Sequence, residues 1–189
     1  MPEDELVEGM IQKCIMHCER GEYEKGLECF EGVTDFKEDA LRAWYLKGLC
    51  LYKLERFKEA EEALRKALEL DARQPQAWHM HGLALYKQGE FEKAADSFLE
   101  AAELEKTNPD HTFMAAVCYA LLGRRQEAEN ASRIACIANP RRTMELLQIF
   151  FETAYIPLSK KSALEKLEIQ KNLNALRAEM EGILRSKEK

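Results

Sequence analysis

The hydrophobic pattern of the chain repeats with a period of 34 residues. Residues 43–60 read AWYLKGLCLYKLERFKEA, and residues 77–94 read AWHMHGLALYKQGEFEKA. Shifting the chain against itself by this period aligns four segments without a gap: 7–40, 41–74, 75–108 and 109–142. A repeat of this length predicts an array of helical hairpins, because one hairpin cannot bury both of its apolar faces and stacked hairpins share a continuous core.

Certain positions of the repeat carry the same kind of residue in each segment. Positions 8, 20 and 27 hold mostly small residues, which allow two helices to approach closely. Large residues at positions 4, 17 and 24, such as Trp44 and Trp78 at position 4, fill the space between hairpins. Position 15 holds Gly21, Glu55, Gly89 and Gly123. Glycine suits the turn after the first helix, where a positive φ is often needed, so we expect a helix of about 14 residues, a tight turn and a second helix in each segment.

These positions resemble the tetratricopeptide repeat, whose 34-residue signature runs Trp–Leu–Gly–Tyr, Ala, Phe, Ala and Pro. The resemblance covers residues 7–142 and is closest in the second and third segments. In the first segment Cys14 replaces the usual Gly, and in the fourth Arg125 and Ser132 depart from the pattern. The resemblance implies an all-α fold, namely a right-handed α-solenoid of antiparallel helix hairpins (the TPR superhelix).

In this family the first helices of the hairpins line a concave groove, and positions 2, 5, 6, 9, 12 and 13 are the ones that reach it. Positions 5, 9 and 12 form one stripe on a helix. Here this stripe is apolar and aromatic, and an uncovered apolar patch usually marks a binding site; burial of the same positions inside a tight superhelix is the alternative. The predicted partner-binding residues are Ile11, Ile15, Tyr45, Leu49, Tyr52, His79, Leu83, Tyr86, Phe113 and Val117.

One type of partner is not expected. Family members that bind heat-shock-protein tails hold the terminal carboxylate with Lys, Asn and Arg at fixed groove positions. The corresponding positions here hold Ile11, Ile15, Leu46, Gln76 and Met80 or, one repeat later, Tyr45, Leu49, Met80, Asp110 and Met114. Neither set supplies the cations and amides that charge-assisted recognition needs.

After Pro140 the period ends. Residues 143–156 are predicted to form a capping helix, which such arrays need at their end, and Pro157 would break it. Residues 157–189 are predicted to contain a long amphipathic helix that starts at Ser162, with Glu165 in capping-box spacing. Its apolar seam consists of Ile169, Leu173, Leu176, Met180 and Ile183. A narrow seam of this kind meets another helix, and that helix could belong to the chain's own array, to a second copy or to another protein.

Composition narrows the class of protein. The net charge is −6, which argues against a nucleic-acid partner because such proteins usually carry a basic patch. No apolar run reaches the roughly 20 residues of a membrane span, and the acidic start MPEDELVEG does not resemble a signal peptide. The six cysteines have no framework spacing, so we expect free thiols in a reducing compartment and a cytoplasmic protein.

No catalytic constellation stands out. Cys14, His17 and Cys18 suggest a metal site, but no fourth ligand is evident and packing is the preferred interpretation. The chain has no phosphate-binding loop, nucleophile elbow or acid–base pair, so no metal, cofactor or enzymatic activity is predicted. The sequence favours a non-catalytic scaffold or adaptor that binds a peptide or helix, with a self-assembling structural protein or a chaperone for a hydrophobic client as alternatives.

Overall fold

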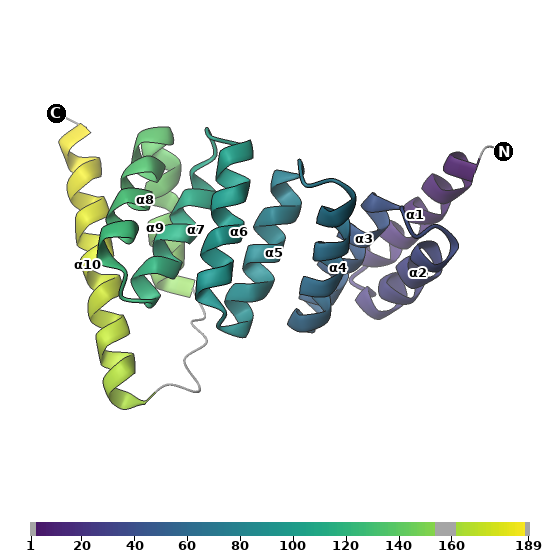
Figure 1. Ribbon diagram of the computed structural model, residues 1–189, viewed down its shortest axis with the longest axis horizontal. Helices are drawn as coiled ribbons and strands as arrows, with labels where there is room; N and C mark the ends of the chain where they lie inside the picture. The colour runs from purple at the N-terminus through teal and green to yellow at the C-terminus, as the bar shows by residue number, and fades with distance from the viewer. Residues whose placement is uncertain (1–2, 154–161, 188–189) are drawn as a thin grey trace. The chain divides into compact units, whose positions relative to one another are not determined.

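The computed structural model describes residues 3–153 and 162–187, and the regular structure of these residues is entirely α-helical (Figure 1). This confirms the predicted all-α class. The helices are α1 (Glu3–Glu19), α2 (Tyr23–Phe36), α3 (Leu41–Lys53), α4 (Phe57–Leu70), α5 (Pro75–Gln88), α6 (Phe91–Leu104), α7 (Pro109–Leu121), α8 (Arg125–Ala138), α9 (Pro140–Thr153) and α10 (Ala163–Lys187).

The chain divides into two compact units, residues 1–84 (unit 1) and residues 85–189 (unit 2), and the division falls within α5. In unit 1, α1 packs against α2, α2 against α3, and α3 against α4. In unit 2, α6 packs against α7 and α7 against α8. Each unit is therefore built from neighbouring helices that follow one another in the chain, as a repeat array requires.

The turns after α1, α3, α5 and α7 share one backbone conformation. The residue at position 15 of each segment has a positive φ, namely 74° at Gly21, 59° at Glu55, 83° at Gly89 and 74° at Gly123. The sequence prediction for this position is therefore confirmed in all four turns. Glu55 adopts the left-handed conformation without being glycine, at a cost of about 1–2 kcal/mol for an L-residue.

Two other repeat positions have a visible structural role. A Cβ atom at Gly48 would lie 2.6 Å from Cγ of Leu64, so the absent side chain lets α3 approach α4. The indole N–H of Trp44 donates to the carbonyl oxygen of Glu38 at 2.7 Å, and that of Trp78 donates to Ala72 at 2.8 Å. Both acceptors lie six residues upstream, so each tryptophan fastens its helix to the end of the preceding hairpin.

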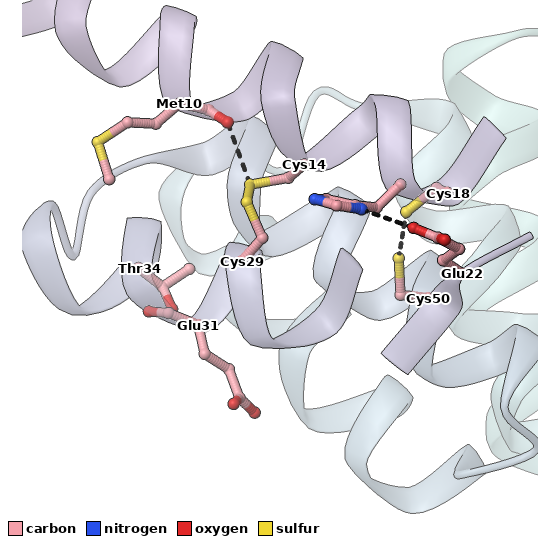
Figure 2. The surroundings of a disulfide bond; sticks show 9 residues. Met10, Cys14, Cys18, Glu22, Cys29, Glu31, Thr34 and Cys50 are labelled. Carbon is pink, nitrogen blue, oxygen red and sulfur yellow. Dashed lines mark hydrogen bonds and ion pairs between the residues drawn. A yellow bond between two sulfur atoms is a disulfide. The ribbon is translucent and has the colours of Figure 1, made fainter. Parts of the chain in front are cut away.

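A disulfide bond between Cys14 and Cys29 joins α1 to α2, with the two Cα atoms 5.3 Å apart (Figure 2). This separation lies within the range that a disulfide spans. The prediction that the cysteines are free thiols is therefore wrong for this pair, although Cys18, Cys50, Cys118 and Cys136 do not form disulfides. The argument for a cytoplasmic location from unpaired cysteines loses its force with this bond.

The C-terminal segments pack on unit 2. Helix α9 begins at Pro140, three residues before the predicted capping helix, while residues 154–156 and Pro157 lie outside the described residues. The predicted capping box of α10 is present, because the Ser162 N–H donates to Oε2 of Glu165 at 2.8 Å and the Glu165 N–H donates to Oγ of Ser162 at 3.3 Å. Helix α10 packs against α7, α8 and α9.

The seam of α10 faces its own chain. Four of its predicted members, Ile169, Leu173, Leu176 and Met180, are buried. Ile183 is only half-buried, and Leu184 takes the next buried position because the final step along the helix is four residues rather than three. Of the three possible partners of the seam, the structure shows the chain's own helices, because α10 packs on α7, α8 and α9.

Candidate functional site

Unit 1 carries a row of half-buried apolar and aromatic side chains on α1, α3 and the first part of α5. We call this set the unit 1 stripe; its members are Ile15, Tyr45, Leu49, Tyr52, His79 and Leu83. Ile11, which the sequence places in the same row, is only 3 % exposed and belongs to the core. The stripe follows from the spacing of positions 5, 9 and 12, which recur on one face of a helix.

The two tyrosines of the stripe are anchored against the core of unit 1. The Tyr52 ring meets the Phe57 ring edge-on, with centroids 5.4 Å apart, which joins the end of α3 to the start of α4. Burial raises the pKa of Tyr45 and of Tyr52. Both hydroxyls therefore remain protonated at neutral pH and can each donate a hydrogen bond to a partner.

A cavity of about 370 Å³ lies beside Tyr45 at the start of α3 and α5. Its volume is within the range of about 300–1,000 Å³ that is usual for ligand sites. Its lining consists of Leu41, Arg42, Tyr45, Ala67, Gln74, Gln76 and Ala77. The floor is apolar, and the exposed Arg42 and Gln76 supply polar groups at its rim, so the cavity suits an apolar side chain whose flanking backbone needs hydrogen bonds.

The polar groups near this cavity are held by neighbours. Arg42 of α3 forms a hydrogen-bonded ion pair with Glu8 of α1. A hydrogen bond from Gln12 and the contact with Arg42 lower the pKa of Glu8, so its carboxylate stays charged. Gln74 donates to Oδ2 of Asp71 at 3.0 Å. Glu8 and Arg42 both occupy position 2 of their segments, so this pair links two successive first helices.

The predicted binding residues of unit 2 are buried and so are not accessible to a partner. Tyr86 is 4 % exposed, Phe113 is 1 % exposed and Val117 is fully buried. The Phe113 ring packs edge-on against Phe150 of α9 at 6.0 Å, and the Tyr86 ring packs against Phe91 at 5.6 Å. The prediction of an open groove is wrong for α7, because α7 is enclosed by α6, α8, α9 and α10, and Tyr86 of α5 is buried beside Phe91 of α6.

Some lining residues of the cavity beside Tyr45 are not among the predicted binding residues. Arg42 occupies position 2, which reaches the groove in the family, and Gln74 immediately precedes the first residue of α5. A second cavity, of about 600 Å³, lies in unit 2 between the α7–α8 hairpin and α10. Its lining includes Ala120, Ala128, Asn172, Ala175 and Glu179. It could not be predicted, because the sequence does not specify where α10 packs.

Neither metal ligation nor a membrane span finds support in the described parts of the chain. Within residues 3–153 and 162–187, no three His, Cys, Asp or Glu side chains are grouped so that they could hold a metal ion. Nδ1 of His17 lies 2.9 Å from Oε2 of Glu22, and Cys14 is bonded to Cys29. None of the described helices is both long enough and apolar enough to cross a membrane.

Comparison with known proteins agrees with the helical repeat. The family model described as tetratricopeptide repeat matches residues 41–73, and the one described as anaphase-promoting complex, cyclosome, subunit 3 matches residues 64–133. No curated protein matches the chain.

Several solved structures share the fold. A crystal structure of MamA protein has a TM-score of 0.74 at 16 % identity, over 98 % of this chain and 93 % of that one. YrrB, a TPR protein with an unusual peptide-binding site, has a TM-score of 0.65 at 20 % identity, over 95 % and 91 %. The first TPR of Spaghetti (RPAP3), bound to the HSP90 peptide SRMEEVD, has a TM-score of 0.60 at 19 % identity, over 62 % and 93 %. These likenesses confirm the α-solenoid fold class.

Proposed function

We propose, from the premise that this chain is a tetratricopeptide repeat protein, that it is a non-catalytic scaffold that binds a peptide or helix on the unit 1 stripe. One observation carries the proposal. The stripe residues keep part of their apolar surface exposed, whereas Phe113 and Val117 at the corresponding positions of α7 are buried. An apolar row that the chain's own helices leave partly exposed is where an external segment would gain most from burial.

The chemistry of the stripe suggests the partner's character. Leu49 and Leu83 offer aliphatic surface, and Tyr45 and Tyr52 combine ring surface with a hydroxyl donor, so the partner would present apolar anchors. One anchor would enter the cavity beside Tyr45, while Gln76 at its rim would hydrogen-bond the partner's backbone. YrrB, which shares the fold, is a TPR protein with an unusual peptide-binding site.

We further propose that the partner is not an acidic heat-shock-protein tail. The positions that would hold a terminal carboxylate carry Ile11, Ile15, Leu46, Gln76 and Met80. Among these side chains only Gln76 has a hydrogen-bond donor, and none is cationic. The first TPR of Spaghetti is bound to an HSP90 peptide, but a likeness at 19 % identity shows a shared fold and not a shared ligand.

The alternative of self-assembly through α10 is less favoured. Leu173 and Met180 are 1 % and 0 % exposed within unit 2, so a dimer through this seam would require α10 to leave α7 and α8. A chaperone role for a hydrophobic client would use the same unit 1 stripe, and the selection experiment below would detect it as low sequence preference among bound peptides.

The proposal can be tested with displayed peptide libraries, one linear and one helical, selected on the full chain. We expect enriched peptides with two or three apolar anchors. Leu49→Glu and Leu83→Glu should each weaken their binding by at least about tenfold, because a desolvated charge replaces an apolar contact. Leu70→Glu is the matched control, since Leu70 lies on α4 in the same unit and is 43 % exposed.

Circular dichroism would check that each variant retains its helices. Unfolding of Leu49→Glu or Leu83→Glu would show that these residues belong to the core and would count against the proposal. Equal loss of binding in Leu70→Glu, or peptides whose amide-shift changes map outside α1, α3 and α5, would refute it. Failure of both libraries to yield a binder would do the same.

A further inference from the structure

Four of the six cysteines gather where α1, α2 and α3 meet (Figure 2). Cys14 of α1 is bonded to Cys29 of α2. Cys18, one turn further along α1, faces Cys50 of α3, and their Sγ atoms are 2.9 Å apart. The second pair is unbonded and joins residues that are 32 positions apart in the sequence.

We propose that Cys18 and Cys50 form a reversible disulfide site, which reacts with a low-molecular-weight disulfide of the oxidised-glutathione class. Oxidation of this pair would tie α1 to α3, in addition to the existing bond between α1 and α2. The inference concerns the thiol chemistry of unit 1 and does not depend on the proposed peptide binding.

The Sγ atoms of Cys18 and Cys50 are close enough to form a disulfide with little movement. A disulfide has an S–S length of about 2.05 Å, so the two Sγ atoms would have to approach by only about 0.9 Å. Both thiols already point toward each other from neighbouring helices (Figure 2). No rearrangement of the order of the helices is needed to bring them together.

Gly26 on α2 provides the space for this pair. A Cβ atom at Gly26 would lie 2.5 Å from Sγ of Cys18 and 3.5 Å from Sγ of Cys50. Gly26 occupies position 20 of its segment, and the other three segments hold Ala60, Ala94 and Ala128 there. The first segment thus lacks a methyl group at the one place where it would collide with the sulfur of Cys18.

The difference in exposure between the two thiols sets the order of the reaction. Cys18 is half-buried and Cys50 is only 3 % exposed, so the reagent would meet Cys18 first. The Cys18 thiolate attacks one sulfur of the reagent, which forms a mixed disulfide and releases one small thiolate that takes up a proton. Cys50, after losing its proton, attacks the Cys18 sulfur, which forms the Cys18–Cys50 bond and releases the second small thiolate.

The buried position of Cys50 also affects the second step. Burial, together with the neighbouring Cys18, strongly raises the pKa of the Cys50 thiol. Its thiolate fraction at neutral pH is therefore small. Ring closure should accordingly be the slower of the two steps, and a transient mixed disulfide on Cys18 should be observable.

The test uses the full chain with its Cys14–Cys29 bond intact, exposed to oxidised glutathione and sampled over time by intact-mass and peptide mass spectrometry. We expect a glutathione adduct on Cys18, followed by a product that is lighter than the starting protein by two hydrogen atoms and contains a Cys18–Cys50 peptide pair. Cys50→Ser should stop at the adduct, and Cys118→Ser should behave like the wild-type chain.

A matched pair of glycine variants tests the geometry. Gly26→Ala should slow formation of the Cys18–Cys50 bond by at least about tenfold. Gly32→Ala on the same helix should not, because no atom lies within 4 Å of a Cβ placed there. Should Gly26→Ala fail to fold, the Cys50→Ser adduct and the wild-type peptide map still decide. A stable adduct on Cys18 that never closes, a bond from Cys18 to Cys14 or Cys29, or equal closure rates in the two glycine variants would overturn the proposal.

Discussion

Arg142 of α9 binds Asp110 of α7 through two hydrogen bonds, from Nε to Oδ1 at 3.0 Å and from Nη2 to Oδ2 at 2.7 Å. The contact with Asp110 raises the pKa of Arg142, so the guanidinium stays charged. Two-point Arg–carboxylate contacts are stronger and more specific in geometry than single ones. The pair spans 32 residues of sequence and fixes the start of α9 on the enclosed helix α7.

Removing this contact should loosen the start of α9. We expect Asp110→Ala to lower the free energy of unfolding by about 1 kcal/mol, because it removes the two-point contact and leaves the Arg142 guanidinium, which is 41 % exposed, only its 3.5 Å contact with Glu145. Arg142→Lys should recover only part of this, since an ammonium group cannot make the same two-point contact. Urea denaturation would measure both. Arg141→Ala is the control, because Arg141 is 93 % exposed; a loss as large as that of Asp110→Ala would contradict the assigned role.

A second prediction concerns the turn between α3 and α4. Glu55 has a φ of 59°, whereas the corresponding residues of the other three turns are glycines. Glu55→Gly should raise the free energy of unfolding by up to about 1 kcal/mol, because it removes the left-handed penalty and gives back part of this gain through a more flexible unfolded chain. Thermal unfolding would detect the gain. Glu55→Ala keeps the Cβ atom and should give no comparable gain; stabilisation by both variants would point to the lost charge instead.

These turns show how far the repeat allowed prediction. The 34-residue period places position 15 in four chemically similar turns, so one requirement for a positive φ could be inferred from four residues at once. The same holds for Trp44 and Trp78, whose indoles make the same hydrogen bond in successive segments. Contacts inside a hairpin and between neighbouring hairpins recur with the period, and a recurring contact leaves a recurring residue in the sequence.

Contacts that occur once leave no such trace. Phe113 and Val117 satisfy the pattern of a groove, but they are buried because α9 and α10 pack on α7 in addition to its neighbours α6 and α8. The seam of α10 indicates an apolar face, but the sequence does not indicate which surface this face packs against. The Cys14–Cys29 bond depends on two residues that sit at different repeat positions, so the period could not pair them.

A third prediction concerns that disulfide. It joins residues 15 positions apart on two helices of unit 1. A disulfide across a loop of this length stabilises the folded state by about 3 kcal/mol in the chain-entropy account, because it restricts the unfolded chain. Reduction, or the double variant Cys14→Ala/Cys29→Ala, should therefore increase hydrogen exchange in α1 and α2 and leave α8 and α10 unchanged. In the reduced form Cys14 regains a thiol hydrogen that it can donate to the Met10 carbonyl oxygen, from which its Sγ atom is 3.1 Å away. Detection of six free thiols in the native, non-reduced protein would disprove the bond.

A fourth prediction concerns the pH dependence of unit 1. His81 is 13 % exposed, and its Nε2 lies 3.5 Å from Oε1 of Glu61. Burial lowers the pKa of His81, and the charge of Glu61 opposes this only in part. The folded state therefore prefers neutral His81. Below the unfolded pKa of about 6.5 the unfolded chain binds more protons than the folded chain. The contribution of His81 to stability is therefore complete above that pH and is lost as the pH falls toward the folded pKa. The loss is about 1.4 kcal/mol for each pH unit by which the folded pKa lies below the unfolded one.

Two variants test this assignment. His81→Gln should remove this part of the loss, so its stability difference from the wild-type chain should change between about pH 7.5 and about pH 5.5. Glu61→Gln removes the opposing charge, should lower the pKa of His81 further and should steepen the loss. Chemical denaturation at the two pH values, combined with NMR titration of the imidazole, would measure both effects. A pKa of His81 above the unfolded value would contradict the prediction.

The final prediction separates the two faces of α10. Leu173 is 1 % exposed and lies in the seam against α7 and α8, whereas Leu167 is 53 % exposed on the same helix. Leu173→Asp would bury an unpaired carboxylate and should lower the free energy of unfolding by about 3–5 kcal/mol. Leu167→Asp changes the same atoms in solvent and should stay within about 0.5 kcal/mol. Detachment of α10 by Leu173→Asp should also increase hydrogen exchange in α7 and uncover the apolar surface around Ala120 and Ala128 to a hydrophobic dye. If the two aspartate variants have equal stability and dye binding, then α10 does not pack on unit 2 in solution.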